Sequence, residues 1–328
     1  MPTPYCLKLE DVVAGIPVPG PHDHKYTRGV VGVVAGSKDY IGAGILCTLG
    51  ANFSGAGMVR YLGSSSVFEH IVGRYPEVVR MPGTVHAYTL GSGNPRGVVE
   101  YLHIASRQKI ALVVDAGAIK YLGDFLIDGE EFPAPTIMTP HAGEMEKFCA
   151  QMKIGDGWDR AFIEGNAAQV ALEVARCTGV IVLLKGCADI VADPQGRVYT
   201  IPSATPWRAV AGAGDVLAGL LGGLLATHVA KNTVDNVALI VAVAAYMHSA
   251  AAASASGTIL PWEKSLAIMD VLGPEVLDYP NAQIPLPTLM EENKGGPIVA
   301  SNIAEHITRA VRMAFEAHCE IGNAKDAC

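Results

Sequence analysis

Two kinds of residue are scarce in this sequence: charged residues make up 17% of its 328 residues and aromatic residues 6%. Because half of the residues are hydrophobic, the chain can bury a large core, which excludes global disorder. Lys and Arg number 24 against 32 Asp and Glu, a formal net charge of −8. This balance, without a basic stripe that carries aromatics, argues against nucleic-acid binding. Phosphate remains a candidate ligand, because backbone N–H groups can bind it without net positive charge.

The sequence also lacks paired cysteines, a signal peptide and a typical membrane span. Its seven cysteines are odd in number, widely spaced and without a CxxC motif, as is typical of free thiols in a reducing cytoplasm. No basic segment followed by an apolar run stands at the N-terminus. The most apolar stretch, 237–253, is rich in alanine and contains Tyr246, His248 and Ser249, which favours a buried helix. We therefore expect a cytoplasmic protein with no membrane partner.

Short apolar runs alternate with segments of helical periodicity. The runs predict strands at 30–35, 57–62, 87–90, 110–114, 136–138 and 180–184, and a hairpin over 190–192 and 198–201. Helices are predicted at 42–53, 97–107, 159–177, 214–228 and 234–255. This order indicates an α/β fold with a mainly parallel sheet that is covered by helices on both faces. The polar or glycine-rich segments that begin at 36, 91, 115, 139 and 185 should then share the carboxyl edge of the sheet, where ligands bind.

Both ends of the chain differ from this pattern. We expect a Pro-rich N-terminal arm over 1–23, with exposed loop histidines at its end, and one domain over 24–328. Residues 274–298 are again Pro-rich and predict a long surface loop. An amphipathic helix is predicted over 299–317, with an apolar face formed by Ile303, Ile307, Ala310, Val311 and Ala314.

The segment Gly212-Ala213-Gly214-Asp215 is the most informative for chemistry. Its small residues let a ligand approach the backbone, and the apolar run behind them starts a helix whose first N–H groups are unpaired. A transferring phosphoryl group suits that position, and Asp215 would serve there as a base for an attacking hydroxyl. The alternative is an ordinary helix start, in which Asp215 is a favourable cap and the glycines form a turn. The motif is no Walker A loop, because the Gly-Lys-Ser/Thr ending is missing.

In this context the chain resembles the ribokinase-like superfamily, and within it the ADP- or ATP-dependent NAD(P)H-hydrate dehydratases. The resemblance covers roughly residues 24–273 and the final helix. Seven segments carry it together: 24–29 with 33–37, 41–43, 54–60 (Ser-Gly-Ala-Gly-Met-Val-Arg), 113–118 (Val-Val-Asp-Ala-Gly-Ala), 139–144 (Thr-Pro-His-Ala-Gly-Glu), 183–186 and 211–219. It implies a ribokinase-like three-layer α/β/α fold.

The resemblance also implies a reaction. Such an enzyme phosphorylates the hydroxyl of the S epimer of hydrated NADH or NADPH from ADP or ATP, with Mg2+ as cofactor. Phosphate then leaves and NAD(P)H is regenerated, so the protein is expected to be a nucleotide repair enzyme. Relatives are often dimers or tetramers. Many carry an epimerase domain, which is expected here to be a separate protein that works alongside this one.

Site residues follow from the same resemblance, position by position. Asp215 matches the catalytic base, and Gly212, Ala213 and Gly214 match the anion hole, with Gly214 also touching the nucleotide. The expected nucleotide-binding stretch is Lys185, Gly186, Cys187, Ala188 and Asp189. Substrate contacts are expected from Ala43, Gly91 and His141, besides Asp215, and Glu144 is expected to hold magnesium through water. From the residues alone, Lys185 would be a solvated lysine at a strand end, His141 a turn residue and Glu144 a first-turn glutamate; Asp115 would line the cleft or cap a turn.

This chain departs from the family pattern at several of these positions. Ala213 stands where Thr is common, so that hydroxyl is missing, and Ala204 replaces the usual glycine of the preceding segment. Asp189 also replaces a common Thr, and a second carboxylate near phosphates would need magnesium or distance. Two alternative functions remain open: a kinase of a hydroxymethyl vitamin precursor (thiazole or pyrimidine), and a nucleotide sensor without catalysis.

Overall fold

The computed structural model describes residues 3–260 and 294–326. Its strands form one nine-stranded sheet in the order β1-β9-β8-β7-β6-β5-β4-β2-β3. All neighbours are parallel except β7 with β8 and β8 with β9, which are antiparallel. The strands are β1 Tyr5–Cys6, β2 Val30–Val34, β3 Met58–Tyr61, β4 Ala87–Leu90, β5 Ala111–Val114, β6 Thr136–Met138, β7 Ile181–Leu184, β8 Ala188–Ala192 and β9 Val198–Pro202.

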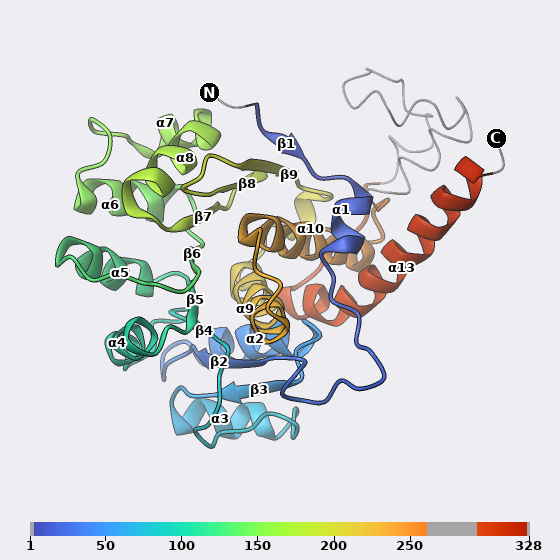
Figure 1. Cartoon of the computed structure of the whole chain (residues 1–328), viewed down its shortest axis with the longest axis horizontal. Coiled ribbons are helices and arrows are strands. Elements are labelled where there is room, and N and C mark those ends of the chain that lie inside the picture. The colour runs from blue at the N-terminus through green and yellow to red at the C-terminus, as the bar shows by residue number, and fades with distance from the viewer. Residues whose placement is uncertain (1–2, 261–293, 327–328) are drawn as a thin grey trace.

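Helices cover both faces of this sheet (Figure 1). Successive residues of a strand point to opposite faces, so in β5 Val113 joins one core while Leu112 and Val114 join the other. One core is covered by α1 Leu9–Ala14, α2 Ile41–Asn52, α3 Ser65–Val72, α9 Ala213–Lys231, α10 Val237–Ser256 and α13 Ala300–Asp326. The other is covered by α4 Val98–Gln108, α5 Ala118–Ile127, α6 Ala142–Met152, α7 Arg160–Gly165 and α8 Ala167–Thr178. The predicted three-layer arrangement with a mainly parallel sheet is confirmed.

The predicted single helix over 159–177 is wrong, because two helices, α7 and α8, cover this region. They meet at Asn166, whose φ of −129° and ψ of 32° are not helical. The side-chain amide of Asn166 donates to the Phe162 carbonyl over 2.9 Å and so competes for a helical acceptor. The strands of the predicted hairpin are confirmed as β8 and β9, whereas helices α3, α5 and α6 were not predicted from the sequence.

Residues near the N-terminus, expected as an arm, contribute to the sheet and the core. Strand β1 pairs in parallel with β9 at the sheet edge, and Val12 of α1 is fully buried. The buried His228 of α9 contacts the Gly15 carbonyl through Nε2 at 3.1 Å. His24 is exposed, as expected, and its Nδ1 accepts from the Tyr26 amide at 3.2 Å within a turn. Residues 5–14 are therefore part of the domain, since they extend its sheet and contribute to its core.

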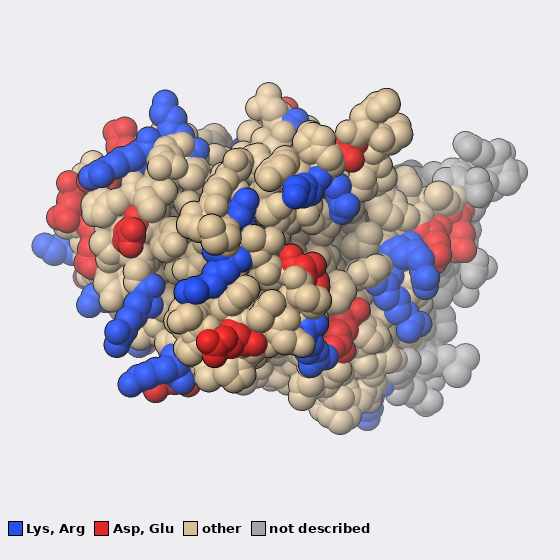
Figure 2. All heavy atoms as spheres, turned by 90° about the horizontal axis from the view of Figure 1, so that it is seen from below, with Lys and Arg blue, Asp and Glu red and all other residues tan. Residues whose placement is uncertain are grey.

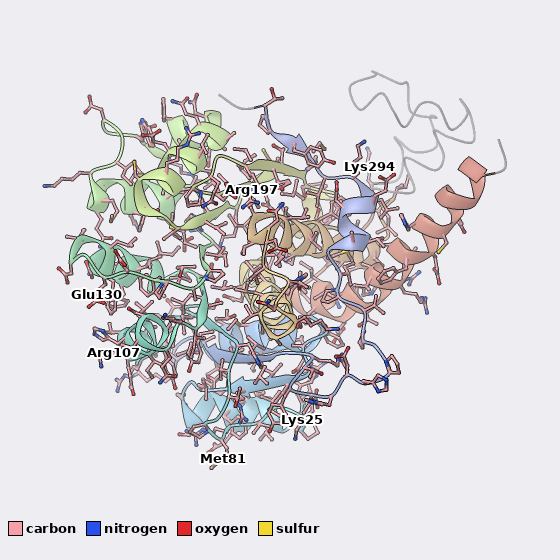
Figure 3. The ribbon with its side chains drawn as sticks, viewed as in Figure 1. Lys25, Met81, Arg107, Glu130, Arg197 and Lys294 are labelled. Atoms are coloured by element: carbon pink, nitrogen blue, oxygen red, sulfur yellow. The ribbon has the colours of Figure 1, made fainter. Side chains whose placement is uncertain are left out.

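Helix α13 begins one residue after its predicted start, and its predicted apolar face is confirmed. Ile303, Ile307, Ala310 and Ala314 are buried in the same core as α10. Of the predicted loop 274–298, residues 274–293 lie outside the described residues, and 294–298 form no regular element. Lys294, labelled in Figure 3, accepts through its backbone carbonyl a hydrogen bond of 2.7 Å from the Trp207 indole.

Helices α9 and α10 are core helices. With 19 and 20 residues they are long and apolar enough to span a membrane, but 78% and 83% of their apolar windows are buried in the fold. Both run through the centre of the molecule (Figure 1). On the face seen in Figure 2, basic and acidic side chains are both spread over the surface.

Close packing between α2 and α9 fixes the position of the Gly212–Asp215 turn. A Cβ on Gly219 of α9 would lie 1.9 Å from the Cys47 carbonyl oxygen, and one on Gly50 of α2 would lie 2.1 Å from that of Val216. Such distances are excluded for real side chains, so these glycines let the two backbones touch. The first turns of α9 are thereby held against the second half of α2.

We expect Gly219→Ala to lower the free energy of unfolding by about 1–3 kcal/mol, because the methyl group must push α2 away from α9. The matched control is Gly42→Ala in the first turn of α2, where an added Cβ would meet nothing within 4 Å. That change should be neutral or stabilise by about 0.5–1 kcal/mol through helix propensity. Urea unfolding followed by circular dichroism measures both; equal effects of the two substitutions would contradict the packing argument.

Candidate active site

Four adjacent strands end side by side at the carboxyl edge of the sheet. Their ends stay in register beyond the strands through backbone hydrogen bonds from Asp115 to Leu90 at 2.9 Å, from Thr139 to Val114 at 3.0 Å and from Lys185 to Pro140 at 2.8 Å. The polar segments that begin at 91, 115, 139 and 185 thus meet at one edge, as the sequence predicted. Parallel strands bring this about because their carboxyl ends all face the same way.

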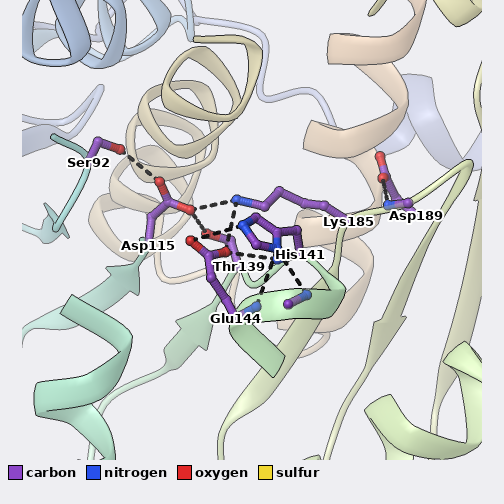
Figure 4. A network of polar contacts seen from close by, with 9 residues as sticks. Ser92, Asp115, Thr139, His141, Glu144, Lys185 and Asp189 are labelled. Atoms are coloured by element: carbon purple, nitrogen blue, oxygen red, sulfur yellow. Dashed lines mark hydrogen bonds and ion pairs between the residues drawn. The ribbon is translucent and has the colours of Figure 1, made fainter. Parts of the chain in front are cut away.

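A buried carboxylate lies at the centre of these strand ends (Figure 4). Asp115, which follows β5, is 2% exposed. Its Oδ1 accepts from Lys185 Nζ at 2.8 Å and from Thr139 Oγ1 at 2.7 Å, and its Oδ2 accepts from Ser92 Oγ at 2.8 Å. Both oxygens are satisfied, which a buried charge requires. The carboxylate thus binds side chains from three neighbouring strand ends, and its expected place in the cleft remains a prediction. Ser92 is a polar partner that the sequence did not predict.

Lys185 is a partly buried cation, paired with Asp115, and not the solvated lysine that its place at a strand end suggested. Its side chain is 19% exposed, and Glu144 Oε2 lies 3.9 Å from Nζ. Burial alone would lower the pKa of Lys185, but the charges of Asp115 and Glu144 outweigh it and raise the pKa. A Cβ built on Gly214 would lie 3.4 Å from Nζ. The ammonium group therefore faces the turn that starts α9.

The Gly212–Asp215 turn has the features of an anion site. Gly212 precedes α9 with a φ of +90°, a conformation that favours glycine, and no side chain caps the helix. The amides of Gly214 and Asp215 bind no backbone carbonyl of the described chain. These N–H groups, the helix dipole and the Lys185 ammonium together make the turn attractive to a phosphate.

Asp215 lies in the first turn of α9 as a partly buried carboxylate. Burial, and next the negative charge of Asp115, raise its pKa from 3.8 to about 6, while Ser92 and Lys185 act in the opposite direction. At neutral pH the group is therefore ionised, yet it is a stronger base than an ordinary aspartate. This is the property that a general base for a hydroxyl requires.

His141 and Glu144 cap helix α6 reciprocally. Nδ1 of His141 accepts from the amides of Gly143 at 3.1 Å and Glu144 at 3.3 Å, and Glu144 Oε2 accepts from the His141 amide at 2.9 Å. An accepting Nδ1 places the proton of a neutral imidazole on Nε2. The cap thus fixes the ring of His141, whose side chain stays 60% exposed at the edge of the site. Glu144 is the first-turn glutamate that its position suggested, and His141, expected as a turn residue, is the N-cap of α6. Their expected ligand roles remain predictions.

Ala43 and Gly91 border the same edge. Gly91 has a φ of +117°, and a Cβ there would lie 2.0 Å from the Asp115 carbonyl oxygen, so only glycine suits the position. Ala43, in the first turn of α2, lies next to Gly93 in the loop after β4. A Cβ built on Gly93 would be 2.6 Å from the Cβ of Ala43. The predicted substrate-contact positions therefore border Ser92 from two sides.

The predicted nucleotide-binding stretch runs from the end of β7 into β8. Gly186 and Cys187 are exposed and Ala188 is half-buried. Asp189 is 1% exposed and turns away from the anion site toward Arg208, which contacts both of its oxygens, at 2.5 and 3.2 Å. Arg208 belongs to the short helix η1 Pro206–Arg208, just before the glycine-rich turn. The extra carboxylate is thus neutralised by an arginine that the sequence reasoning missed, although it is the one basic residue between 201 and 215.

A buried histidine also lies behind the turn. His248 of α10 is 2% exposed, and neither ring nitrogen has a hydrogen-bond partner within the described chain. Burial, and next the charge of Arg208, lower its pKa to about 3, so the imidazole is neutral at physiological pH.

Metal-ligating side chains are few at the site. Across residues 3–260 and 294–326, no group of three or more His, Cys, Asp or Glu side chains is placed to hold a metal ion. Mg2+ commonly takes only one or two carboxylates and completes its shell with phosphate oxygens and water. Glu144, with a side chain 22% exposed, fits such a shared cation.

Comparison with known proteins gives consistent matches. The NAD(P)H-hydrate dehydratase family model matches residues 31–267. The bifunctional NAD(P)H-hydrate repair enzyme Nnr of Mycobacterium tuberculosis is 39% identical over 230 residues, which are 67% of this chain and 46% of that protein. The chain thus spans about half the length of the curated relatives that it matches.

Solved structures share the fold. The ADP/ATP-dependent NAD(P)H-hydrate dehydratase of Bacillus subtilis, co-crystallised with ATP and Mg2+, has a TM-score of 0.66 at 24% identity and covers 94% of this chain and 97% of its own. A ribokinase-like superfamily protein of Enterococcus faecalis has a TM-score of 0.62 at 17% identity, with 94% and 95% covered. The expected ribokinase-like fold is confirmed.

The raised pKa of Asp215 predicts a stability penalty that depends on pH. The folded state binds this proton more tightly than the unfolded chain, so stability is lost as pH rises from about 4 to about 6. We expect Asp215→Asn to raise the free energy of unfolding by up to about 3 kcal/mol at pH 7.5 and to have little effect near pH 4. Asp189→Asn, the control, should lower it by about 3–5 kcal/mol at pH 7.5, because Arg208 loses its buried partner. Thermal unfolding at both pH values measures this; a destabilised Asp215→Asn at pH 7.5 would refute it.

Proposed function

The chain belongs to the NAD(P)H-hydrate dehydratase family, and on this premise we propose that it repairs hydrated NADH or NADPH. It dehydrates the S epimer to NAD(P)H at the expense of ADP or ATP. The observation that carries the proposal is the partly buried Asp215, a carboxylate of raised pKa beside the unpaired amides of α9 and the Lys185 ammonium. A base and a phosphate site in contact are what the phosphorylation of a hydroxyl needs.

The proposed reaction has two chemical steps. Asp215 accepts the proton of the substrate hydroxyl while the hydroxyl oxygen attacks the terminal phosphorus of the nucleotide. The bond between that phosphorus and the bridging oxygen of the departing nucleotide breaks. The C–O bond of the phosphate ester then breaks as the ring nitrogen supplies its electron pair, and phosphate leaves. Loss of a proton from the neighbouring ring carbon restores the double bond. The activation is needed because hydroxide is a poor leaving group and phosphate a better one.

The remaining residues bind and orient the reactants in this proposal. The Gly212-Ala213-Gly214 turn holds the transferring phosphoryl group, with the unpaired amides of Gly214 and Asp215 as donors, since the Ala213 amide already donates to the Val210 carbonyl at 3.2 Å. Lys185 neutralises part of the phosphoryl charge. The backbone of 185–189 binds the nucleotide, while the Asp189 carboxylate stays with Arg208. Ala43, Gly91 and His141 contact the hydrated ring. Magnesium, held by the nucleotide phosphates and through water by Glu144, would supply further charge neutralisation.

The location and partners are inferred with the function. We infer a cytoplasmic enzyme that forms a dimer or tetramer and functions together with an epimerase activity; the curated relatives are bifunctional repair enzymes. A kinase of a hydroxymethyl vitamin precursor would share the fold but release a phosphorylated product. A sensor without catalysis would gain nothing from a basic carboxylate beside a phosphate.

The direct test is recovery of absorbance at the NADH band. We expect the protein to restore NADH from its chemically prepared hydrate in the presence of Mg2+ with ADP or with ATP, the two donors being run side by side. Asp215→Asn should lose about 10²–10⁴-fold in kcat, as removal of a general base does, yet still bind the nucleotide in calorimetry. Normal turnover by this variant would exclude Asp215 as the base. No recovery with either donor, together with phosphorylation of a thiazole or pyrimidine alcohol, would establish the kinase instead.

The acid limb of kcat should report the ionisation of Asp215. Since the base must be ionised, kcat is expected to fall tenfold per pH unit below about pH 6. Asp115→Asn removes the charge that raises this pKa and leaves the Lys185 charge unbalanced; both changes lower the pKa of Asp215, so the limb moves to lower pH. Thr139→Val, which removes a hydroxyl but no charge, is the control and should leave the limb near pH 6. A limb that does not move in Asp115→Asn would show that another group titrates.

A further inference from the structure

The loop after β2 brings a large aromatic side chain, Tyr40, to the edge of the sheet that carries the site. The Gly36 amide of this loop donates to the Ser92 carbonyl at 2.7 Å, and the Ser92 hydroxyl donates to Asp115. A Cβ built on Gly93 would lie 3.1 Å from the Cβ of Tyr40. Tyr40 is 60% exposed, and within residues 3–260 and 294–326 its ring contacts no other aromatic ring and its hydroxyl has no hydrogen-bond partner. The chemistry described so far makes no use of this ring.

Tyr40 belongs to a face of α2 that leads from the surface to the carboxylates of the site. Tyr40 at the N-cap, Ala43 and Cys47 follow one another at positions i, i+3 and i+7, which lie on one side of a helix. Cys47 is fully buried, and burial, and next the charges of Asp215 and Asp115, raise the pKa of its thiol. The inner end of this face therefore lies close to the two carboxylates, and its outer end is the exposed tyrosine.

Apolar side chains also border the turn that starts α9. A Cβ built on Gly212 would lie 2.4 Å from Leu46 Cδ1 of α2 and 3.1 Å from the Cβ of Ala300, the first residue of α13. The ion pair of the site comes instead from the ends of β5 and β7. A substrate ring that presents its hydroxyl to Asp215 would thus meet α2 as its apolar neighbour.

We propose that the Tyr40 ring stacks on the hydrated nicotinamide ring of the substrate and stabilises the positive charge that this ring acquires during elimination. The inference rests on the proposed function. In the second step phosphate leaves with the electron pair of the C–O bond, and the electron pair of the ring nitrogen forms a C=N bond. The substrate ring is then a cation until the neighbouring carbon loses its proton. The face of an aromatic ring attracts such a cation, and an attraction that grows only in this step raises kcat rather than tightening binding.

The test replaces the ring while an apolar side chain is kept. Tyr40→Leu should lower kcat for hydrated NADH about five- to thirtyfold, the size of a cation–ring contact, with KM within about threefold of wild type. Tyr40→Phe, which keeps the ring, should restore kcat to within about threefold of wild type. Neither substitution removes a helix cap, because the Tyr40 side chain makes no cap hydrogen bond. Tyr26→Leu is the matched control: Tyr26 is 42% exposed and precedes β2 at the opposite edge of the sheet, so kcat and KM should not change.

A single-turnover measurement separates the two chemical steps. Release of the shortened nucleotide reports phosphorylation, and absorbance at the NADH band reports elimination. Because the positive charge develops only in the second step, Tyr40→Leu should delay the appearance of NADH while nucleotide release keeps its wild-type rate.

The alternatives give different results. Wild-type kcat in Tyr40→Leu would show that the ring does not act on the substrate, and an equal delay of both steps, or a loss that Tyr40→Phe does not restore, would contradict charge stabilisation. If Tyr40→Leu instead alters the oligomeric state in size-exclusion chromatography at unchanged kcat, the ring packs against a second copy of the chain and the proposal is wrong. Failure of the wild-type protein to restore NADH with either ADP or ATP would overturn the proposed function itself, whereas a negative result confined to the Tyr40 variants leaves that function intact.

Discussion

The buried ion pair between Asp115 and Lys185 is the interaction on which the site depends. It joins the ends of β5 and β7 across the end of β6, and Thr139 of that middle segment donates to the same carboxylate oxygen. A pair so buried is stable only while both partners and their hydrogen bonds are present. It therefore fixes where the ammonium group points, and the ammonium group faces the start of α9. The position of the anion site relative to the sheet follows from this pair and from the α2–α9 contact.

The same pair sets the electrostatics of Asp215. Asp115 contributes a negative charge that raises the pKa of Asp215, after burial, while Lys185 counteracts it. A second ion pair, Asp189 with Arg208, lies on the side of the turn where the nucleotide is proposed to bind. Its arginine, together with burial, keeps His248 neutral behind the turn. Two cations, Lys185 and Arg208, thus flank the proposed phosphate site, and each is paired with a carboxylate.

Much of the fold was predictable because its signals are local. Parallel strands that are buried on both faces read as short apolar runs, and these located β2, β4 and β6 closely. The edge of the sheet where Gly91, Asp115 and Lys185 meet followed from the alternation of strands and helices alone. The helix over 159–177 failed because a single side-chain amide, that of Asn166, ends α7 without disturbing the apolar periodicity. The contribution of β1 to the sheet had no local signal, since two exposed residues carry no pattern.

The sequence by itself determined the fold class, the glycine-rich turn with its aspartate and the family, since these depend on residue types and their order. Only the tertiary structure decided which acidic side chain pairs with which basic one. Asp115 meets Lys185 across 70 residues and Asp189 meets Arg208 across 19, so neither partner can be deduced from spacing. The pKa of Asp215 is a property of that arrangement, because it depends on burial and on the distance to charges from three other strand ends. The motif supplies the carboxylate, and the surrounding fold makes it a base.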